Sequence, residues 1–366
     1  MAAYGPLIPG VRKIAVLRAN AIGDYVFCLP ALTALRAAYP RADILLLGKA
    51  WHAELLVGRP GPVDRIAVVP DDAGLVEQVD DPRRLDRLPF FENMRAERFD
   101  LALQLYGGGR HSNPFVRRLG AKVTVGMHDR DVEPLDRSLP FVYFQHEIVR
   151  YLEVVALAGA PVVTLEPRFA VTDTDRAASL SFIPAGDAPL AIINPGASDA
   201  RRRWPIEHFR AVGHALQRSG ARVIVSGNQA ERPLCEELAR ALGDGTTNVA
   251  GRLSLHALVG LLARAAVIVS NDTGPLHLGT AVGARTVGIF WAFNLTNSSP
   301  LLRTRHRPFA AWDPRCPKCG ADNSVGRCGH DVSFVATVPV ADVQRAALEF
   351  LREAQVHGAR RAPALA

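Results

Sequence analysis

Short apolar runs alternate along the chain with longer segments of mixed polarity. Each apolar run has the length of a buried β-strand, and polar or glycine-containing residues follow it. We expect strands at 13–18, 42–47, 65–69 and 101–105 in the first half of the chain, and at 190–194, 222–226, 267–270 and 286–290 in the second half.

Segments with helical spacing stand between these strands. Residues 26–39 are amphipathic and end before Pro40, residues 206–218 carry the same period, and residues 340–353 form a terminal helix. Strands separated by helices indicate βαβ units. The pattern therefore predicts an α/β fold in which helices cover both faces of parallel sheets.

The strand–helix series starts twice, which predicts two domains. A chain of 366 residues also exceeds what one hydrophobic core usually holds. Turn-forming residues between 166 and 189 mark the junction, so we expect Rossmann-like domains at 1–170 and 171–366, with the terminal helix a candidate to pack back on the first. Ligands of doubly wound domains bind outside the carboxyl ends of the strands, here facing a central cleft.

Composition narrows the class of protein. A hydrophobic content of 48% excludes a disordered chain, and no apolar run reaches the length of a membrane span. The net charge is +7 and nearly all of the positive charge is arginine, which binds phosphate through two parallel hydrogen bonds. Aromatic residues are not interleaved with the basic ones, so we do not expect a nucleic-acid partner.

Five cysteines indicate a reducing cytoplasm, because their number is odd and three of them crowd into one short segment. That segment contains Cys316, Cys319, Cys328 and His330, a candidate tetrahedral zinc site. The gap of eight residues after Cys319 is shorter than in common zinc ribbons. A loop staple, a disulfide and unliganded thiols stay open as alternatives.

The first chemical motif follows the strand at 267–270. Asp272, Thr273 and Gly274 lead into a short helix, where unpaired backbone N–H groups and the positive end of the helix dipole suit a phosphate. His277 lies one turn further and can donate a hydrogen bond to a phosphate oxygen. The alternative is a helix cap beside a packed histidine.

The second motif follows the strand at 190–194. Gly196 and Ser198 precede three consecutive arginines and the Trp204–Pro205 entry to a helix. Clustered guanidinium groups beside a Gly–Ser loop match a diphosphate, with Arg202 and the Ser198 hydroxyl as ligands. The alternative is a solvated basic loop.

The third motif is the elbow from Arg18 to Asp24 after the first strand. It lacks the glycine spacing of a dinucleotide-binding loop. Its carboxylate, Asp24, is a plausible general base for a hydroxyl group. The alternative for an aspartate at this position is a cap of the following helix.

Together these three motifs resemble, in order and over nearly the whole chain, the family 9 glycosyltransferases, which include the ADP-heptose:lipopolysaccharide heptosyltransferases. The resemblance is carried by Arg18 to Asp24 with 29–32, by 195–198 with 202–205, and by Asp272 to His277 with 281–284. It implies a GT-B fold and an inverting, metal-independent sugar transfer that needs no cofactor. The first motif departs mildly from the family's form at Asn20.

The resemblance also implies roles for individual residues. Asp24 would be the catalytic base, and an acidic residue after the next strand, Glu231, would hold the nucleoside. The donor diphosphate would be held by Arg202 of the second motif and by four residues of the first: Asp272, Thr273, Gly274 and His277. We expect acceptor recognition in loops of the first domain, with Arg18 and Arg110 as candidates.

The expected partners are therefore a nucleotide-sugar donor, with an ADP-sugar favoured, and a glycan, lipid-linked or small-molecule acceptor. The expected location is the cytoplasm or the cytoplasmic periphery of the inner membrane. Two alternatives remain at this point. A sugar-nucleotide epimerase shares the architecture, and a non-catalytic basic module could use the cysteine-rich element to bind nucleic acid.

Overall fold

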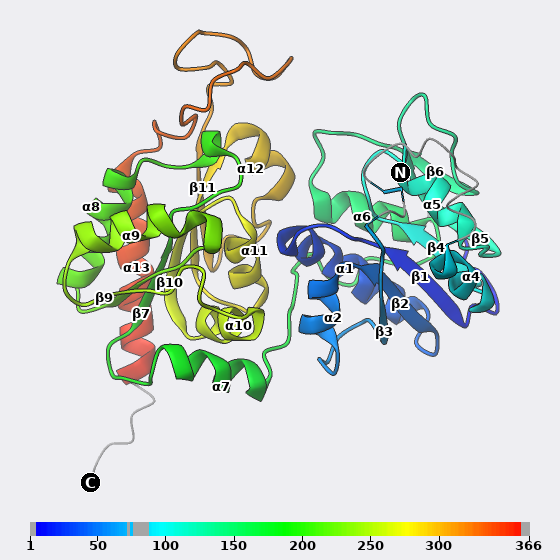
Figure 1. Cartoon of the computed structure of the whole chain (residues 1–366), viewed down its shortest axis with the longest axis horizontal. Coiled ribbons are helices and arrows are strands. Elements are labelled where there is room, and N and C mark those ends of the chain that lie inside the picture. Colours follow the sequence, from blue (N-terminus) through cyan, green and yellow to red (C-terminus); the bar gives the residue numbers. More distant parts are fainter. Residues whose placement is uncertain (1–4, 72–73, 76–87, 360–366) are drawn as a thin grey trace. The chain divides into compact units, whose positions relative to one another are not determined.

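The chain divides into two compact units, Met1–Ala170 (unit 1) and Val171–Ala366 (unit 2). The computed structural model describes residues 5–71, 74–75 and 88–359 (Figure 1). Among these residues, no helix is both long and apolar enough to cross a lipid bilayer.

Unit 1 is built on a six-stranded parallel sheet with the strand order β3-β2-β1-β4-β5-β6. The strands are β1 Lys13–Leu17, β2 Asp43–Gly48, β3 Arg65–Val68, β4 Leu101–Gln104, β5 Val123–His128 and β6 Arg137–Pro140. The described helices are α1 Ile22–Ala38, α2 Ala50–Leu56, α4 Pro89–Ala96, α5 Ser112–Arg118 and α6 Glu147–Ala156. The central strands are almost wholly apolar because helices cover them on both faces.

Unit 2 repeats the plan with the order β12-β11-β10-β7-β8-β9. Its strands are β7 Leu190–Asn194, β8 Arg222–Val225, β9 Thr246–Asn248, β10 Ala265–Asn271, β11 Thr286–Trp291 and β12 His306–Ala311. Its helices are α7 Asp173–Phe182, η1 Ala200–Arg202, α8 Ile206–Arg218, η2 Gln229–Glu231, α9 Arg232–Leu242, α10 Leu255–Ala263, α11 Gly274–Ala281, α12 Ala292–Ser298 and α13 Val340–Ala359. The predicted α/β fold with two doubly wound parallel sheets is confirmed.

The terminal helix α13 belongs to the core of unit 2. Its buried side chains Val343, Ala347, Phe350 and Leu351 join the same hydrophobic cluster as the strands β7, β8 and β10. Packing of this helix on unit 1, which the sequence suggested, stays a prediction.

Each sheet has one position where the strand order reverses, between β1 and β4 in unit 1 and between β7 and β10 in unit 2. In folds of this kind the loops that follow the central strands diverge to opposite faces, and ligands bind outside the carboxyl ends of the strands. All three sequence motifs lie in these loops: 18–24 follows β1, 195–203 follows β7, and 272–274 follows β10.

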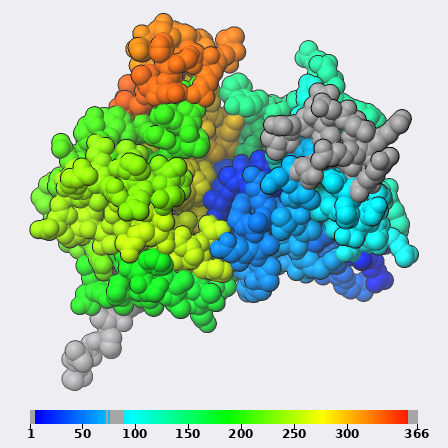
Figure 2. All heavy atoms as spheres, in the orientation of Figure 1, coloured from blue at the N-terminus to red at the C-terminus, as the bar shows by residue number. Residues whose placement is uncertain are grey.

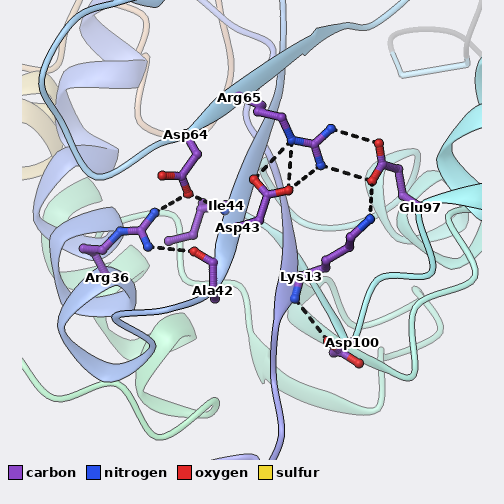
Figure 3. Close-up of polar contacts among 9 residues, drawn as sticks. All are labelled: Lys13, Arg36, Ala42, Asp43, Ile44, Asp64, Arg65, Glu97 and Asp100. Atoms are coloured by element: carbon purple, nitrogen blue, oxygen red, sulfur yellow. Dashed lines mark hydrogen bonds and ion pairs between the residues drawn. The ribbon is translucent and has the colours of Figure 1, made fainter.

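Charged residues fasten the opposite, amino edge of the unit 1 sheet (Figure 3). Arg65, which begins β3, contacts Asp43, which begins β2, with Nε 2.9 Å from Oδ2. The same guanidinium lies 2.9 Å from Oε1 of Glu97, whose Oε2 accepts from Lys13 Nζ at 2.8 Å. Hydrogen bonds from Arg65 and Lys13 lower the pKa of Glu97 from 4.5 to about 2.

We predict that Glu97→Gln lowers the thermal midpoint at pH 7 by about 2 to 4 °C, equivalent to about 1 kcal/mol for partly exposed pairs. The folded-state pKa of Glu97 is depressed, so its contribution is complete above the unfolded value of 4.5 and is lost as the pH falls toward about 2. The gap between wild type and variant should therefore close over that window. Melting curves of both proteins from pH 7 to pH 2 measure it. Glu54→Gln is the control, since Glu54 is exposed on α2; an equal shift there would contradict the prediction.

Candidate active site

The loops after β7 and β10 are joined by the side chain of Arg202. Its Nη1 lies 3.0 Å from Oδ2 of Asp272, and its Nη2 donates to Ser198 Oγ at 2.8 Å. The 3₁₀ turn η1 carries Arg202, and the Asp199 side chain begins that turn by accepting from Arg201 N at 3.0 Å. Three residues predicted as donor ligands from separate motifs therefore lie together.

Asp272 is the carboxylate on which this cluster converges. Besides Arg202 at Oδ2, its Oδ1 accepts from His277 Nε2 at 2.9 Å and from Ser298 Oγ at 3.0 Å. The side chain is only 3% exposed. Burial would raise the pKa of the Asp272 carboxyl, but the hydrogen bond and charge of His277 and the charge of Arg202 bring it below its ordinary value. The carboxylate is thus ionised and orients two cationic or donor groups.

The start of α11 adds backbone donors to the same cluster. Thr273 is extended and precedes the helix, whose second residue is Pro275. Among the described residues, no partner accepts from the N–H groups of Thr273 or Gly274. Unpaired N–H groups at a helix N-terminus bind anions, and here they lie in the same loop as the carboxylate that holds Arg202 and His277.

Glu231 ends the 3₁₀ turn η2, which follows β8, and is 9% exposed. Its backbone N–H donates to Asn228 Oδ1 at 3.0 Å, and its Oε2 accepts from Asn228 N at 2.9 Å. The carboxyl group also packs against Gly196: a Cβ added to this glycine would lie 2.1 Å from Glu231 Cδ. The glycine of the second motif is therefore needed for close approach.

Two asparagines that the sequence analysis did not single out end the strands β7 and β10. Asn271 ends β10 and ties the neighbouring loop, donating to Pro195 O at 2.8 Å and accepting from Trp204 N at 3.0 Å. Asn194 ends β7, is fully buried, and has no partner for either amide atom among the described residues. Because unpaired buried amides are rare, Asn194 is a candidate binding residue. The signal was a polar residue closing an apolar strand.

In unit 1, the Asp24 carboxylate occupies the first turn of α1. Its Oδ2 accepts from the N–H of Ala21 at 3.0 Å, so the residue does cap the helix. Its Oδ1 lies 3.0 Å from Nη2 of Arg18, and 34% of the side chain is exposed. Capping and a chemical role are compatible here, since the cap holds the carboxylate in one orientation while part of it stays accessible.

Arg18 is held from several sides. Its side chain is 4% exposed, its Nη1 donates to Leu105 O, and its guanidinium lies 4.9 Å from the centre of the Tyr151 ring. Such burial leaves little guanidinium surface for direct contact with an acceptor. The bonds of Arg18 fit a role in positioning Asp24.

Glu147 is a second carboxylate beside Arg18 that the sequence analysis missed. Its Oε2 lies 3.6 Å from Arg18 Nη2, and it also pairs with Arg150 and the Tyr151 hydroxyl. Burial raises the pKa of Glu147, against the lowering effect of the charges on Arg18 and Arg150. The polar residues at 147, 150 and 151 share one helical face, which was the available signal.

Arg110 is exposed after a loop of three glycines that follows β4. The loop is anchored, because Gln104 Nε2 donates to Gly107 O at 3.2 Å. Gly108 packs against Asp129, whose carboxylate would lie 2.0 Å from an added Cβ. No contact links Arg110 to Asp24, so its part in acceptor recognition stays a prediction.

The four candidate metal ligands are also brought together. The donor atoms of Cys316, Cys319, Cys328 and His330 all lie within 4.8 Å of one another. Their chemistry is treated separately below.

Comparison with known proteins identifies relatives for this arrangement. The sequence pattern of the family described as glycosyltransferase family 9 (heptosyltransferase) matches residues 87–311. Lipopolysaccharide heptosyltransferase 2 of Salmonella typhimurium is 26% identical over 294 residues, which cover 76% of this chain and 82% of that protein. The resemblance seen in the motifs is confirmed.

Solved structures share the fold. A family 9 glycosyltransferase from Veillonella parvula matches with a TM-score of 0.76 and 19% identity, over 93% of this chain and 97% of that one. The E. coli ADP-heptose LPS heptosyltransferase II matches with a TM-score of 0.73 and 20% identity, over 93% and 99%. The predicted GT-B type of α/β fold is confirmed.

The contact between Gly196 and Glu231 generates a test of the site's construction. We predict that Gly196→Ala displaces the Glu231 carboxylate from its cap on Asn228 N and destabilises the protein by about 1 kcal/mol. In a Glu231→Ala background the same change should cost little, because the obstructing carboxylate is gone.

Thermal melts of the two single variants and the double variant give the coupling. Gly186→Ala is the matched control, since an added Cβ there meets nothing within 4 Å. Additive losses of stability in the double variant would show that Gly196 is not required to make room for Glu231.

Proposed function

Because this chain belongs to glycosyltransferase family 9, the heptosyltransferases, we propose that it transfers heptose from ADP-heptose to a hydroxyl of a lipopolysaccharide-core acceptor. Family membership makes the protein a glycosyltransferase, which leaves no support for the epimerase and nucleic-acid-binding alternatives. The observation that carries the proposal is the convergence of Arg202 and His277 on the Asp272 carboxylate, next to the unpaired N–H groups of Thr273 and Gly274 in the same loop.

Unit 2 binds the donor in this proposal. The leaving ADP carries its charge on the diphosphate, and stabilisation of that charge lowers the barrier when the donor groups are already oriented. Arg202 is still 22% exposed, so part of its side chain stays accessible while Ser198 and Asp272 hold the guanidinium. The unpaired N–H groups of α11 supply further donors, and Glu231 binds the nucleoside through Oε1.

Unit 1 supplies the base. Asp24 presents a partly exposed carboxylate that Arg18 and the amide of Ala21 hold in place. Arg18 is a positioning residue in this scheme, and the exposed Arg110 is the candidate for acceptor contact.

The reaction is a single displacement. The acceptor oxygen bonds to the anomeric carbon as its proton passes to Asp24, and the bond between that carbon and the diphosphate oxygen breaks on the opposite face. The sugar is inverted, and the electron pair leaves with ADP. The protein's own cations neutralise the leaving group, so the transfer itself calls for no metal. A cytoplasmic location beside the inner membrane suits the five unpaired thiols and a lipid-linked acceptor.

We predict that Asp24→Asn lowers kcat for heptose transfer by about 10²- to 10⁴-fold, the usual contribution of a general base. Affinity for ADP should stay within twofold, because the amide oxygen still caps Ala21 and unit 2 is unaltered. Acceptor-dependent ADP release and calorimetric ADP titration measure the two quantities. Weakened ADP binding with unchanged kcat would remove Asp24 as the base.

We predict that Arg202→Ala weakens ADP binding by about tenfold or more, since a charge-assisted contact to phosphate contributes about 1.5 to 3 kcal/mol. The control is Arg210→Ala, which removes the same charge from the exposed face of α8. Titration with ADP, UDP and GDP measures the loss of affinity and the preference for one nucleobase. Equal losses in the two variants would reduce the role of Arg202 to net charge.

A further inference from the structure

The segment between β12 and α13 spans residues 312–339 and contains no helix or strand. It extends from unit 2 in orange in Figure 1 and protrudes from its surface in Figure 2. A single antiparallel bridge joins Arg315 to Asp322. Its ends are anchored in the core by Cys316 and by Phe334, Val335 and Val338, whereas Val325 in between is 89% exposed. Apolar burial therefore does not explain why the middle of the segment is folded.

Four metal-binding side chains gather within this segment. The sulfurs of Cys316, Cys319 and Cys328 and a ring nitrogen of His330 lie within 4.8 Å of one another, and Cys316 Sγ is 3.7 Å from His330 Nδ1. A tetrahedral ion with metal–sulfur bonds of about 2.3 Å sets its ligand atoms about 3.5 to 3.8 Å apart. The ligand set would close on an ion with small side-chain movements.

The backbone holds the ligands in this arrangement. Cys316 N donates to Ala321 O, and Gly320 N donates back to Cys316 O, both at 2.9 Å. Gly320 has φ of 73°, so the chain turns tightly after Cys319. On the other side, the Asn323 amide donates to Cys328 Sγ at 3.6 Å, the kind of bond that stabilises a metal-bound thiolate.

We propose that Cys316, Cys319, Cys328 and His330 bind one Zn²⁺ in a closed structural site. Three thiolates and one imidazole are ligands that Zn²⁺ prefers in tetrahedral geometry, and four protein ligands leave no open position for catalysis. None of the five cysteines is paired in a disulfide.

The ion would also stabilise residues 199–202, the turn in unit 2 that carries Arg202. Asn323 Oδ1 accepts from Arg201 Nη1 at 3.3 Å, and Phe334 N donates to Arg201 O at 2.8 Å. Arg201 in turn forms an ion pair with Asp199, in which Nε donates to Oδ1 at 3.0 Å. Arg201 immediately precedes Arg202 in the chain. An ordered zinc segment thus holds the turn that presents Arg202. This second step rests on the proposed function, whereas the metal site does not.

Metal content of the full chain, untagged and purified without chelators, tests the site by mass spectrometry of the elements. We expect about one zinc per chain, lost in Cys319→Ser and retained in Cys235→Ala, which removes a buried thiol elsewhere in unit 2. Iron in place of zinc, no metal, or a disulfide among these cysteines would overturn the assignment.

Folding is checked on the wild-type chain. Removal of zinc by a chelator should lower the melting temperature of the chain, and added zinc should restore it. A melting temperature that is indifferent to both treatments would contradict a structural role even if zinc were found.

ADP titration tests whether the zinc segment supports Arg202 through Arg201. Cys319→Ser and Arg201→Met should each weaken ADP binding by about fivefold or more, and the double variant no further, because both break one connection. Additive losses of ADP affinity in the double variant would show that the zinc segment does not act on Arg202 through Arg201. If Arg202→Ala leaves ADP binding unchanged in the zinc-loaded chain, the proposed donor site fails while the metal site stands.

Discussion

The buried carboxylate of Asp272 holds together the side chains of the candidate donor site in unit 2. An ionised carboxylate at 3% exposure is costly unless it is paired, and here it is paired with Arg202, His277 and Ser298 at once. The cost of burial keeps those partners in place, because releasing any of them would leave a charge unsatisfied. The cluster is therefore preorganised for the diphosphate of the proposed donor.

Unit 1 uses the same ion-pair chemistry with the burial reversed. In the Arg18–Asp24 pair the arginine is 4% exposed and the aspartate 34%, whereas in the Arg202–Asp272 pair the arginine is 22% exposed and the aspartate 3%. The buried member of each pair anchors the other member. Unit 1 thus presents a carboxylate, which the proposed function uses as the base, and unit 2 presents a cation, which the proposed function uses to bind the leaving diphosphate.

The two sheets explain why these pairs form where they do. Arg18 and Asp24 follow β1, whereas Arg202 follows β7 and Asp272 follows β10. All three strands lie next to a reversal of strand order, where the loops of such folds part. The ion pairs of Lys13, Arg65 and Glu97 fasten the opposite edge of the unit 1 sheet. In unit 1 these ion pairs and the Arg18–Asp24 pair therefore lie at opposite ends of the strands.

The sequence by itself determined elements whose buried positions form a regular pattern. The strand 190–194 and the helix 206–218 have the predicted bounds, because an apolar run or a helical period records burial directly. The edge strands β6, β9 and β12 were not predicted, since most of their residues are only half-buried and form no continuous apolar run. The interior strand β5 was also missed, because Thr124 and Gly126 interrupt its apolar pattern.

Motif order was enough to predict the family, and it singled out Ser198, Arg202 and Asp272, which the structure brings together. Only the tertiary structure decided that Glu147 lies against Arg18, that Gly196 makes room for Glu231, and that four dispersed ligands converge in one segment. Such contacts join residues far apart in the chain, and they depend on how loops fold over a sheet. No local pattern of polarity encodes that geometry.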